Sequence, residues 1–252
     1  LAGVSTSTAG FIGLAERGPV EGLPVLVTSM NDFRRKFGGY LSENQFGNYR
    51  FLAYAVDQFF INGGSRAYIM RVAPSDAKTA SYSGEFLTVT AKNPGSWANQ
   101  VEIHCEPSSK AKTQIFEDLG NNKYRVKNSA GFNEGDRVVF TDGNEKRFST
   151  VVSARDNIIE LSDSLGDDVT DNNLVPVKIL STLEFNLHVV CGDENETFEH
   201  CSFNVNAANY VDKVASRSSL VNVTAAGNVD VAAMFAETNK ISATLSGGSD
   251  GS

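Results

Sequence analysis

The sequence predicts an α+β fold in which an α/β frame is interrupted by a β-sandwich or small β-barrel insertion. Residues 1–80 alternate strand-like and helix-like patterns, as a βαβ unit does. Residues 81–203 show short strand-like runs separated by turn residues, without an amphipathic helix. From residue 204 onward, strand and helix patterns are mixed again. With 252 residues, 41% of them hydrophobic, the chain can build one large core or two smaller ones.

Strands are predicted near both ends of the first 80 residues. Residues 10–15 are apolar and lead into a turn at 17–19, and residues 66–73 form a second apolar run. Residues 23–28 fit an edge strand, because Pro24 has no N–H to donate to a neighbour. Together these segments predict a small sheet.

Two helices are predicted between these strands. Ser29 is placed to cap the first helix, in which Met30, Phe33 and Phe37 recur at helical spacing and Gly38-Gly39 follows. The second helix extends from about Tyr49 to Ile61, with its apolar side chains on one face. These helices are expected to pack on the sheet.

Nine strands are predicted in the β-rich region, at residues 86–91, 100–105, 123–127, 137–141, 147–153, 157–161, 174–180, 182–191 and 197–203. Their spacing is typical of a β-sandwich or a small barrel. Residues 123–161 form four strands with tight turns, which indicates a self-contained barrel. We therefore expect a variable small-barrel insertion at about 107–180.

The last segment predicts a helix capped by Asn206, a strand at 219–223, a helix at 229–237 and a strand at 241–246. The expected domains are an α/β frame, made of residues 1–80 together with 204–252, and a β-rich region at 81–203. The chain begins at Leu1 and ends at Ser252 without familiar terminal signals. We expect it to be a truncated piece of a longer subunit.

The charge pattern excludes several classes of partner. Residues 1–80 carry 8 Lys and Arg against 6 Asp and Glu, whereas residues 81–252 carry 14 against 24. An acidic chain without a basic stripe is a poor match for nucleic acid or for an anionic membrane surface. No apolar run is long enough to cross a bilayer, so direct membrane insertion is not expected. Three cysteines indicate reduced thiols.

A nucleophile motif is present near the end of the chain. Residues 247–251 match Gly-x-Ser-x-Gly, centred on Ser249. That motif requires a strand before it, a helix after it, and an acid and a histidine downstream. All three histidines precede Ser249, which favours a glycine-rich turn over a hydrolase site.

The histidines and cysteines occur close together in the sequence, as His104-Cys105, His188 with Cys191, and His200-Cys201. A zinc ion can use such ligands. However, neighbours in a strand point to opposite faces, so His104 and Cys105 cannot readily share one ion. We expect the cysteines to face the core and the histidines to face solvent.

Four other features have some of the residues that a binding site needs. The acidic loop with Asp163, Asp167, Asp168 and Asp171 lacks EF-hand spacing. Residues 5–10 resemble a phosphate cradle only in composition. Trp97 is expected to be packed, and residues 34–36 form a basic run at a helix end, where they complement the dipole. We therefore predict no catalytic, cofactor-binding or metal-ligating residue, and no cofactor.

Several motifs resemble the contractile-tail sheath family of phages, pyocins and related injection systems. They are residues 3–13 with 17–19, residues 32–40, residues 54–72, residues 94–99, residues 201–221 and residues 245–251. Residues 94–99 resemble the Gly-Trp-Gly-Asn turn of that family, but Ala98 stands where glycine is usual. Because alanine avoids positive φ, a slightly different turn is expected. Residues 107–180 carry no resemblance.

The resemblance implies a structural and mechanical role without catalysis. Sheath subunits form homo-oligomeric helical rings around an inner tail tube on a baseplate, and contract to drive the tube through a host envelope. The resemblance also implies that the protein belongs to a virion tail that is assembled in the host cytoplasm. We expect the family's terminal arms and C-terminal portion to have no counterpart in residues 1–252, and therefore expect this chain alone to be monomeric. The alternative is a β-sandwich adhesin or receptor-binding module, with a ligand patch on residues 123–180 and a trimeric assembly.

Overall fold

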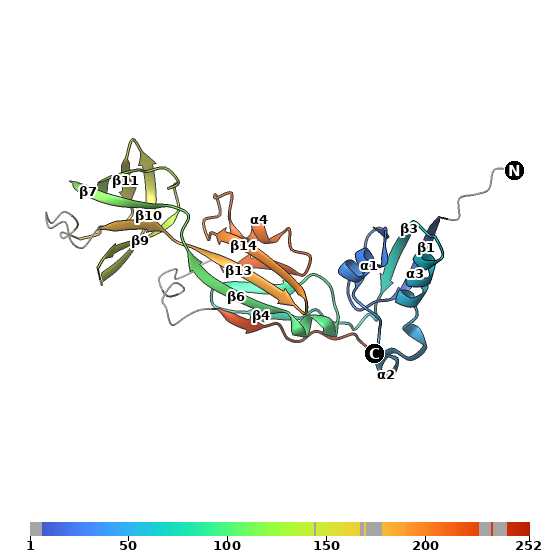
Figure 1. The fold of residues 1–252 in the computed structure, drawn as a ribbon. Coiled ribbons are helices and arrows are strands. Elements are labelled where there is room, and N and C mark those ends of the chain that lie inside the picture. The colour runs from blue at the N-terminus through green and yellow to red at the C-terminus, as the bar shows by residue number, and fades with distance from the viewer. Residues whose placement is uncertain (1–6, 144, 167–168, 170–177, 227–232, 234–240) are drawn as a thin grey trace.

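Three hydrophobic cores follow one another along an elongated molecule (Figure 1). This computed structural model describes residues 7–143, 145–166, 169, 178–226, 233 and 241–252. We call the three parts the N-terminal unit (residues 7–73), the sandwich (residues 78–108, 183–226 and 241–249) and the barrel (residues 111–182). The predicted α+β class with a β-barrel insertion is confirmed.

The N-terminal unit is a three-stranded sheet covered by helices. Its strands lie in the order β1-β3-β2, with β1 parallel and β2 antiparallel to β3. Gly13 allows the close approach of a helix, since an added Cβ would lie 3.2 Å from Cβ of Leu52. The elements are β1 (Thr8–Leu14), β2 (Val25–Val27), α1 (Met30–Phe37), α2 (Glu43–Phe46), the 3₁₀ turn Gly47–Tyr49, α3 (Leu52–Ile61) and β3 (Arg66–Val72).

Helix α1 confirms the predicted cap and stop. The hydroxyl of Ser29 accepts a hydrogen bond from the main-chain N–H of Asp32 at 3.1 Å, and Gly38 ends the helix at a positive φ of 84°. Phe33 and Phe37 are fully buried and stack on each other with ring centroids 5.3 Å apart. The apolar face read from the sequence is therefore the face that enters the core.

The sandwich packs two sheets around one core. One sheet has the order β14-β13-β6-β16 and the other β15-β5-β4. Buried side chains from both sheets, including Val89, Ile103 and Leu187, share this core. The elements are β4 (Ser81–Ser83), β5 (Leu87–Ala91), the 3₁₀ turn Ser96–Gln100, β6 (Glu102–Ser108), β13 (Glu184–Cys191), β14 (Glu194–Cys201), α4 (Val211–Ala215), β15 (Val221–Ala225) and β16 (Ser242–Thr244).

The barrel closes in the order β10-β11-β8-β7-β12-β9. Closure removes the free sheet edges, and apolar side chains such as Tyr124, Phe140 and Leu180 fill the interior. The strands are β7 (Lys112–Gly120), β8 (Lys123–Val126), β9 (Arg137–Asp142), β10 (Glu145–Arg155), β11 (Ile158–Leu161) and β12 (Ile179–Thr182).

The cores divide the chain differently from the expected domain boundaries. Val211, Val221 and Leu245 are buried in the sandwich core, whereas the buried residues of the N-terminal core all lie between 15 and 69. The buried apolar residues described from 211 onward therefore pack in the sandwich core. Strand β15 pairs with β5, and this long-range pairing has no local sequence signal.

Several element predictions were incomplete or wrong. Strands β4 and β7 were not predicted, and the self-contained four strands at 123–161 need β7 and β12 to close. Asn206 does not cap α4, which begins after Tyr210 and has no side-chain cap. All of the helix predicted at 229–237 except Ala233, and most of the strand predicted at 174–180, lie outside the described residues. None of the described helices is long and apolar enough to cross a membrane.

Candidate functional site: two polar joints between the cores

Ser249 lies in a strand-like pairing. Its main-chain N–H donates to the carbonyl of Lys78 at 3.0 Å, and its carbonyl accepts from the N–H of Lys78 at 2.9 Å. A nucleophile motif instead holds its serine on a sharp strand-to-helix turn. Ser249 thus connects the end of the chain to the first residues of the sandwich.

The histidines and cysteines occupy opposite faces of one sheet. Cys105 and Cys201 are buried, and burial raises the pKa of each thiol to about 12. His104 and His188 lie opposite each other on β6 and β13, with ring centroids 6.2 Å apart on the exposed face. The prediction that the cysteines face the core is confirmed for Cys105 and Cys201, whereas Cys191 is half-buried. Within the described ranges, no three His, Cys, Asp or Glu side chains are grouped to hold a metal ion.

The remaining predicted features have structural roles where they are described. In the acidic loop, Asp163 accepts a hydrogen bond from the hydroxyl of Ser162 at 2.6 Å, while Asp167, Asp168 and Asp171 lie outside the described residues. Residues 8–10 of the supposed phosphate cradle are part of strand β1. Trp97 is packed in the sandwich core, as predicted.

The predicted basic run is engaged within the N-terminal unit. In α1, Arg35 and Lys36 both pair with Asp32, at 2.7 and 3.0 Å. The guanidinium of Arg34 lies over the ring of Tyr40, 5.5 Å from its centroid.

The N-terminal joint fastens the N-terminal unit to the sandwich. We define it as Arg71, Ser96, Asn99, Gly248 and Asp250. The carboxylate of Asp250 accepts hydrogen bonds from the N–H of Ser96 at 3.0 Å and from its hydroxyl. It also accepts one from the side-chain amide of Gln45 at 2.9 Å, so one carboxylate contacts both parts.

Asn99 and Gly248 reinforce this joint with a reciprocal pair of hydrogen bonds. The amide of Asn99 donates to the carbonyl of Gly248 and accepts from its N–H, both at 2.9 Å. A Cβ at position 248 would lie 2.5 Å from the carbonyl oxygen of Gly95, so only glycine fits there. The main chain at Gly248 is therefore in direct contact with the main chain at Gly95.

Arg71 is the buried cation of the N-terminal joint. Its guanidinium, on a residue only 3% exposed, donates to the carbonyls of Ala15 at 3.0 Å and Gly18 at 2.9 Å, and more weakly to that of Glu16. Burial lowers the pKa of Arg71, and the negative charge of Asp250 opposes this shift. The guanidinium of Arg71 thus holds the loop after β1, and the negative charge that favours it belongs to Asp250, near the end of the sequence.

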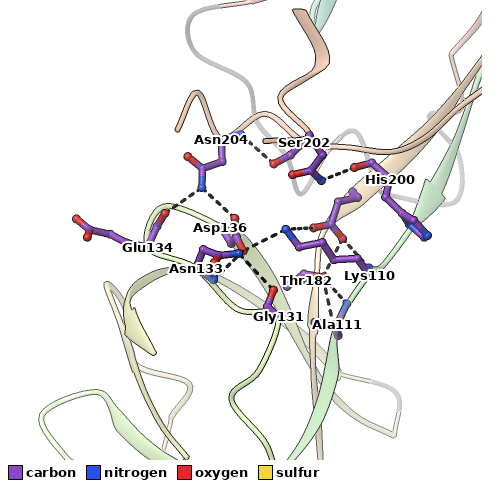
Figure 2. Close-up of polar contacts among 12 residues, drawn as sticks. Lys110, Ala111, Gly131, Asn133, Glu134, Asp136, Thr182, His200, Ser202 and Asn204 are labelled. Atoms are coloured by element: carbon purple, nitrogen blue, oxygen red, sulfur yellow. Dashed lines mark hydrogen bonds and ion pairs between the residues drawn. The ribbon is translucent and has the colours of Figure 1, made fainter. Parts of the chain in front are cut away.

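The barrel joint fastens the barrel to the sandwich, and Figure 2 shows its contacts. We define it as Lys110, Asp136, Thr182, Glu184 and Asn204. Glu184 is 1% exposed and accepts from the N–H of Lys110 at 2.9 Å and from the hydroxyl of Thr182 at 2.8 Å. The ammonium of Lys110 lies between two carboxylates, 3.8 Å from Glu184 and 3.7 Å from Asp136.

Asn204 bridges the two parts from the sandwich side. Its amide donates to the carboxylate of Asp136 and to the carbonyl of Glu134, both at 2.9 Å, and both acceptors lie in the barrel (Figure 2). Its oxygen accepts from the N–H of Asn206 at 3.1 Å.

Burial raises the pKa of Glu184, while the hydrogen bonds that Lys110 and Thr182 donate to it oppose the rise.

Neither joint was predicted as a site. A charged residue at an inward position of an apolar strand was the available signal for Glu184 in residues 182–191. Asp250 carried no comparable signal, because its partner Ser96 lies 154 residues earlier. The hydrogen bonds of each joint hold neighbouring parts of the molecule against each other.

The fold was compared with known proteins. No protein-family model matches the sequence, and no curated protein matches it. Among solved structures, it is similar to a sheath tail protein from Desulfitobacterium hafniense, with 14% identity, a TM-score of 0.38, and coverage of 98% of this chain and 36% of that one. It is also similar to a sheath tail protein from Listeria innocua, with 12% identity, a TM-score of 0.42, and coverage of 96% and 34%. The chain therefore spans about a third of either protein.

Proposed function

We propose that this chain is part of a contractile tail sheath subunit and has a structural and mechanical role without catalysis. The carrying observation is that three separate motifs resembling the sheath family meet in the N-terminal joint. They are the loop at 17–19, the turn at 94–99 and the glycine-rich block at 245–251. An added Cβ at Gly95 would lie 3.2 Å from both the carbonyl of Glu16 and the carboxylate of Asp250.

The physical basis is the need of a mechanical subunit to transmit force between its parts. Contraction moves rigid bodies between discrete arrangements. A joint made of charge-assisted hydrogen bonds and close main-chain packing resists bending better than a flexible linker. The aligned cores with a polar joint at each junction suit a body that transmits force along its length (Figure 1).

The proposed partners follow from the same role. They are further copies of the subunit in helical rings, an inner tail tube and a baseplate, in a virion tail assembled in the host cytoplasm. We propose that the contacts which build the lattice require more than residues 1–252, so that this chain alone is monomeric.

Assembly is the test. Residues 1–252 and the longer subunit that contains them are compared by negative-stain microscopy and sedimentation velocity. Tubes or stacked rings from the longer protein, with monomers from residues 1–252, support the proposal. If neither assembles and residues 1–252 form a stable trimer, the sheath proposal fails and the adhesin alternative takes its place.

A further inference from the structure

A groove with positively charged walls lies between the N-terminal unit and the sandwich. It has a volume of about 530 Å³, and α1 lies on the side of the N-terminal unit that faces the sandwich (Figure 1). The residues that matter here are Arg17, Arg35, Lys36, Lys92, Trp97 and Asn222. Two cations come from α1, one from the loop after β1, and one from the sandwich.

The positive charges of this groove exceed the carboxylates that pair with them. Arg35 and Lys36 share the single carboxylate of Asp32. Arg17 pairs with Glu194, and the ammonium of Lys92 donates to the carbonyls of Ser216 and Ser218. Glu196 also reaches this wall through hydrogen bonds from Ser218 and Ser219, so four cations face three carboxylates in a chain whose net charge is −8. This excess favours an anionic ligand.

Two buried donors at this groove lack acceptors among the described residues. They are the indole Nε1 of Trp97, a residue only 5% exposed, and Nε of Arg17. The guanidinium carbon of Arg17 lies 5.8 Å from the centroid of the Trp97 ring, so the two groups are neighbours. Buried donors are nearly always paired in folded proteins, so an unpaired adjacent pair requires an explanation. A ligand that brings a hydrogen-bond acceptor to these two donors would provide that explanation.

We propose that this groove binds a carboxylate-bearing peptide segment of a partner protein. The volume of the groove is larger than a single small ion needs and leaves room for an extended peptide. Arginine and lysine recognise carboxylates by charge-assisted hydrogen bonds, and Asn222 adds a neutral polar group along the wall. This site goes beyond the proposed function, since it names the chemistry of a ligand. It adjoins the N-terminal joint through the loop at 17–19 and the turn at 94–99.

The chain carries its own reporter for this site. Trp97 is the only tryptophan in the sequence, so its fluorescence and its single indole N–H resonance report on the groove alone. Hexaglutamate is titrated into ¹⁵N-labelled protein, with hexaglutamine as the neutral control. We expect saturable changes in the indole resonance and in fluorescence with hexaglutamate only. Raising the salt from about 0.1 to about 1 M, which shortens the screening length from about 10 to about 3 Å, should weaken them.

Charge-neutralising variants locate the effect. Arg35→Gln combined with Lys92→Gln should raise the dissociation constant of hexaglutamate about fivefold or more, from two lost ion contacts of modest strength each. Lys127→Gln removes an exposed charge from the barrel and should leave binding unchanged. Circular dichroism of each variant checks that it is folded.

Four outcomes overturn the proposal. They are an unchanged indole resonance at saturating hexaglutamate, equal binding by the double variant, an equal response to inorganic phosphate at the same concentration, and tighter binding of an oligonucleotide. The third identifies a site for any small anion, and the fourth a nucleic-acid site. None depends on whether the longer subunit assembles, so failure here is distinguishable from failure of the sheath proposal.

Discussion

Asp250 accepts two hydrogen bonds from Ser96, a residue 154 positions earlier in the chain. The same carboxylate accepts from Gln45 of the N-terminal unit and offsets the buried charge of Arg71. One side chain therefore connects the end of the chain to two of its three parts. The N-terminal joint is the place where local changes should have the largest consequences for the arrangement of those parts.

Asp250→Asn should weaken the N-terminal joint. The variant keeps the shape of the side chain but removes the charge opposite Arg71 and sets an NH₂ group against at least one of the three donors that Asp250 accepts from. We expect the free energy of unfolding to fall by about 1–3 kcal/mol. Urea denaturation followed by the fluorescence of Trp97, which adjoins Ser96, measures it. Asp193→Asn on the exposed β13–β14 turn is the control, and an equal effect of both substitutions would contradict this role.

Asn204 and Asp136 should be energetically coupled across the barrel joint. A double-mutant cycle with Asn204→Ala and Asp136→Ala isolates their contact, which measures 2.9 Å. We expect a coupling energy of about 1–3 kcal/mol, because the hydrogen bond is buried and involves a carboxylate. The matched cycle of Asn204→Ala with Asp142→Ala, at the end of β9, should give a value near zero. Similar coupling in both cycles would show that the contact is not specific.

Glu184 should make stability depend on pH in a defined direction. Burial raises its pKa above the value in the unfolded chain, so the folded state binds the proton more tightly. Its contribution is therefore full below the unfolded pKa, about 4.3 for glutamate, and is lost as the pH rises through the raised folded pKa. Glu184→Gln lacks this loss, so its stability relative to the parent should increase with pH.

Denaturation at several pH values between about 4 and 8 tests this expectation. Glu199→Gln, on an exposed position of β14, is the matched control and should follow the parent. If the free energies of unfolding of Glu184→Gln and of the parent changed with pH in parallel, the expectation for Glu184 would be contradicted. Lys110 and Asp136 face Glu184 in the same joint and are left unchanged in each variant.

The three cysteines should differ in reactivity. At a pKa of about 12, the thiols of Cys105 and Cys201 are ionised in about one molecule in ten thousand at pH 8, and both are buried. Cys191 is half-buried and is expected to react first. Ellman's reagent should modify one thiol in the native protein and three after denaturation. Fast reaction of the native Cys191→Ser variant would show that a buried thiol is accessible.

Local patterns predicted elements well and their partners poorly. Ser29, Phe33 and Phe37 specify α1 because capping and helical spacing act within a few residues. Strand β15 was expected near its observed position, but its pairing with β5 was not, because nothing within residues 219–223 identifies a partner 130 or so positions earlier. The packing of Val211 and Val221 in the sandwich core was not predicted, for the same reason.

The joints were hidden from the sequence for a related reason. Asp136, Glu184 and Asn204 become a site only when three distant segments meet, and each alone resembles an ordinary polar residue. The barrel itself was easier to predict, because turn residues recur at short intervals through 120–161. Its closing strand β7 was missed, since residues 112–120 lack a regular apolar alternation over their second half.

The position of the barrel in the chain has a practical consequence. Strand β6 ends at Ser108, directly opposite Glu184 at the start of β13, so the chain leaves and re-enters the sheet at neighbouring points. Paired residues of adjacent strands lie about 5 Å apart, a gap that a short hairpin turn can bridge. The barrel is therefore an insertion between two adjacent strands that could be exchanged for another domain. Any small domain whose two ends lie equally close together could be inserted between β6 and β13 while the rest of the sheet keeps its pairing.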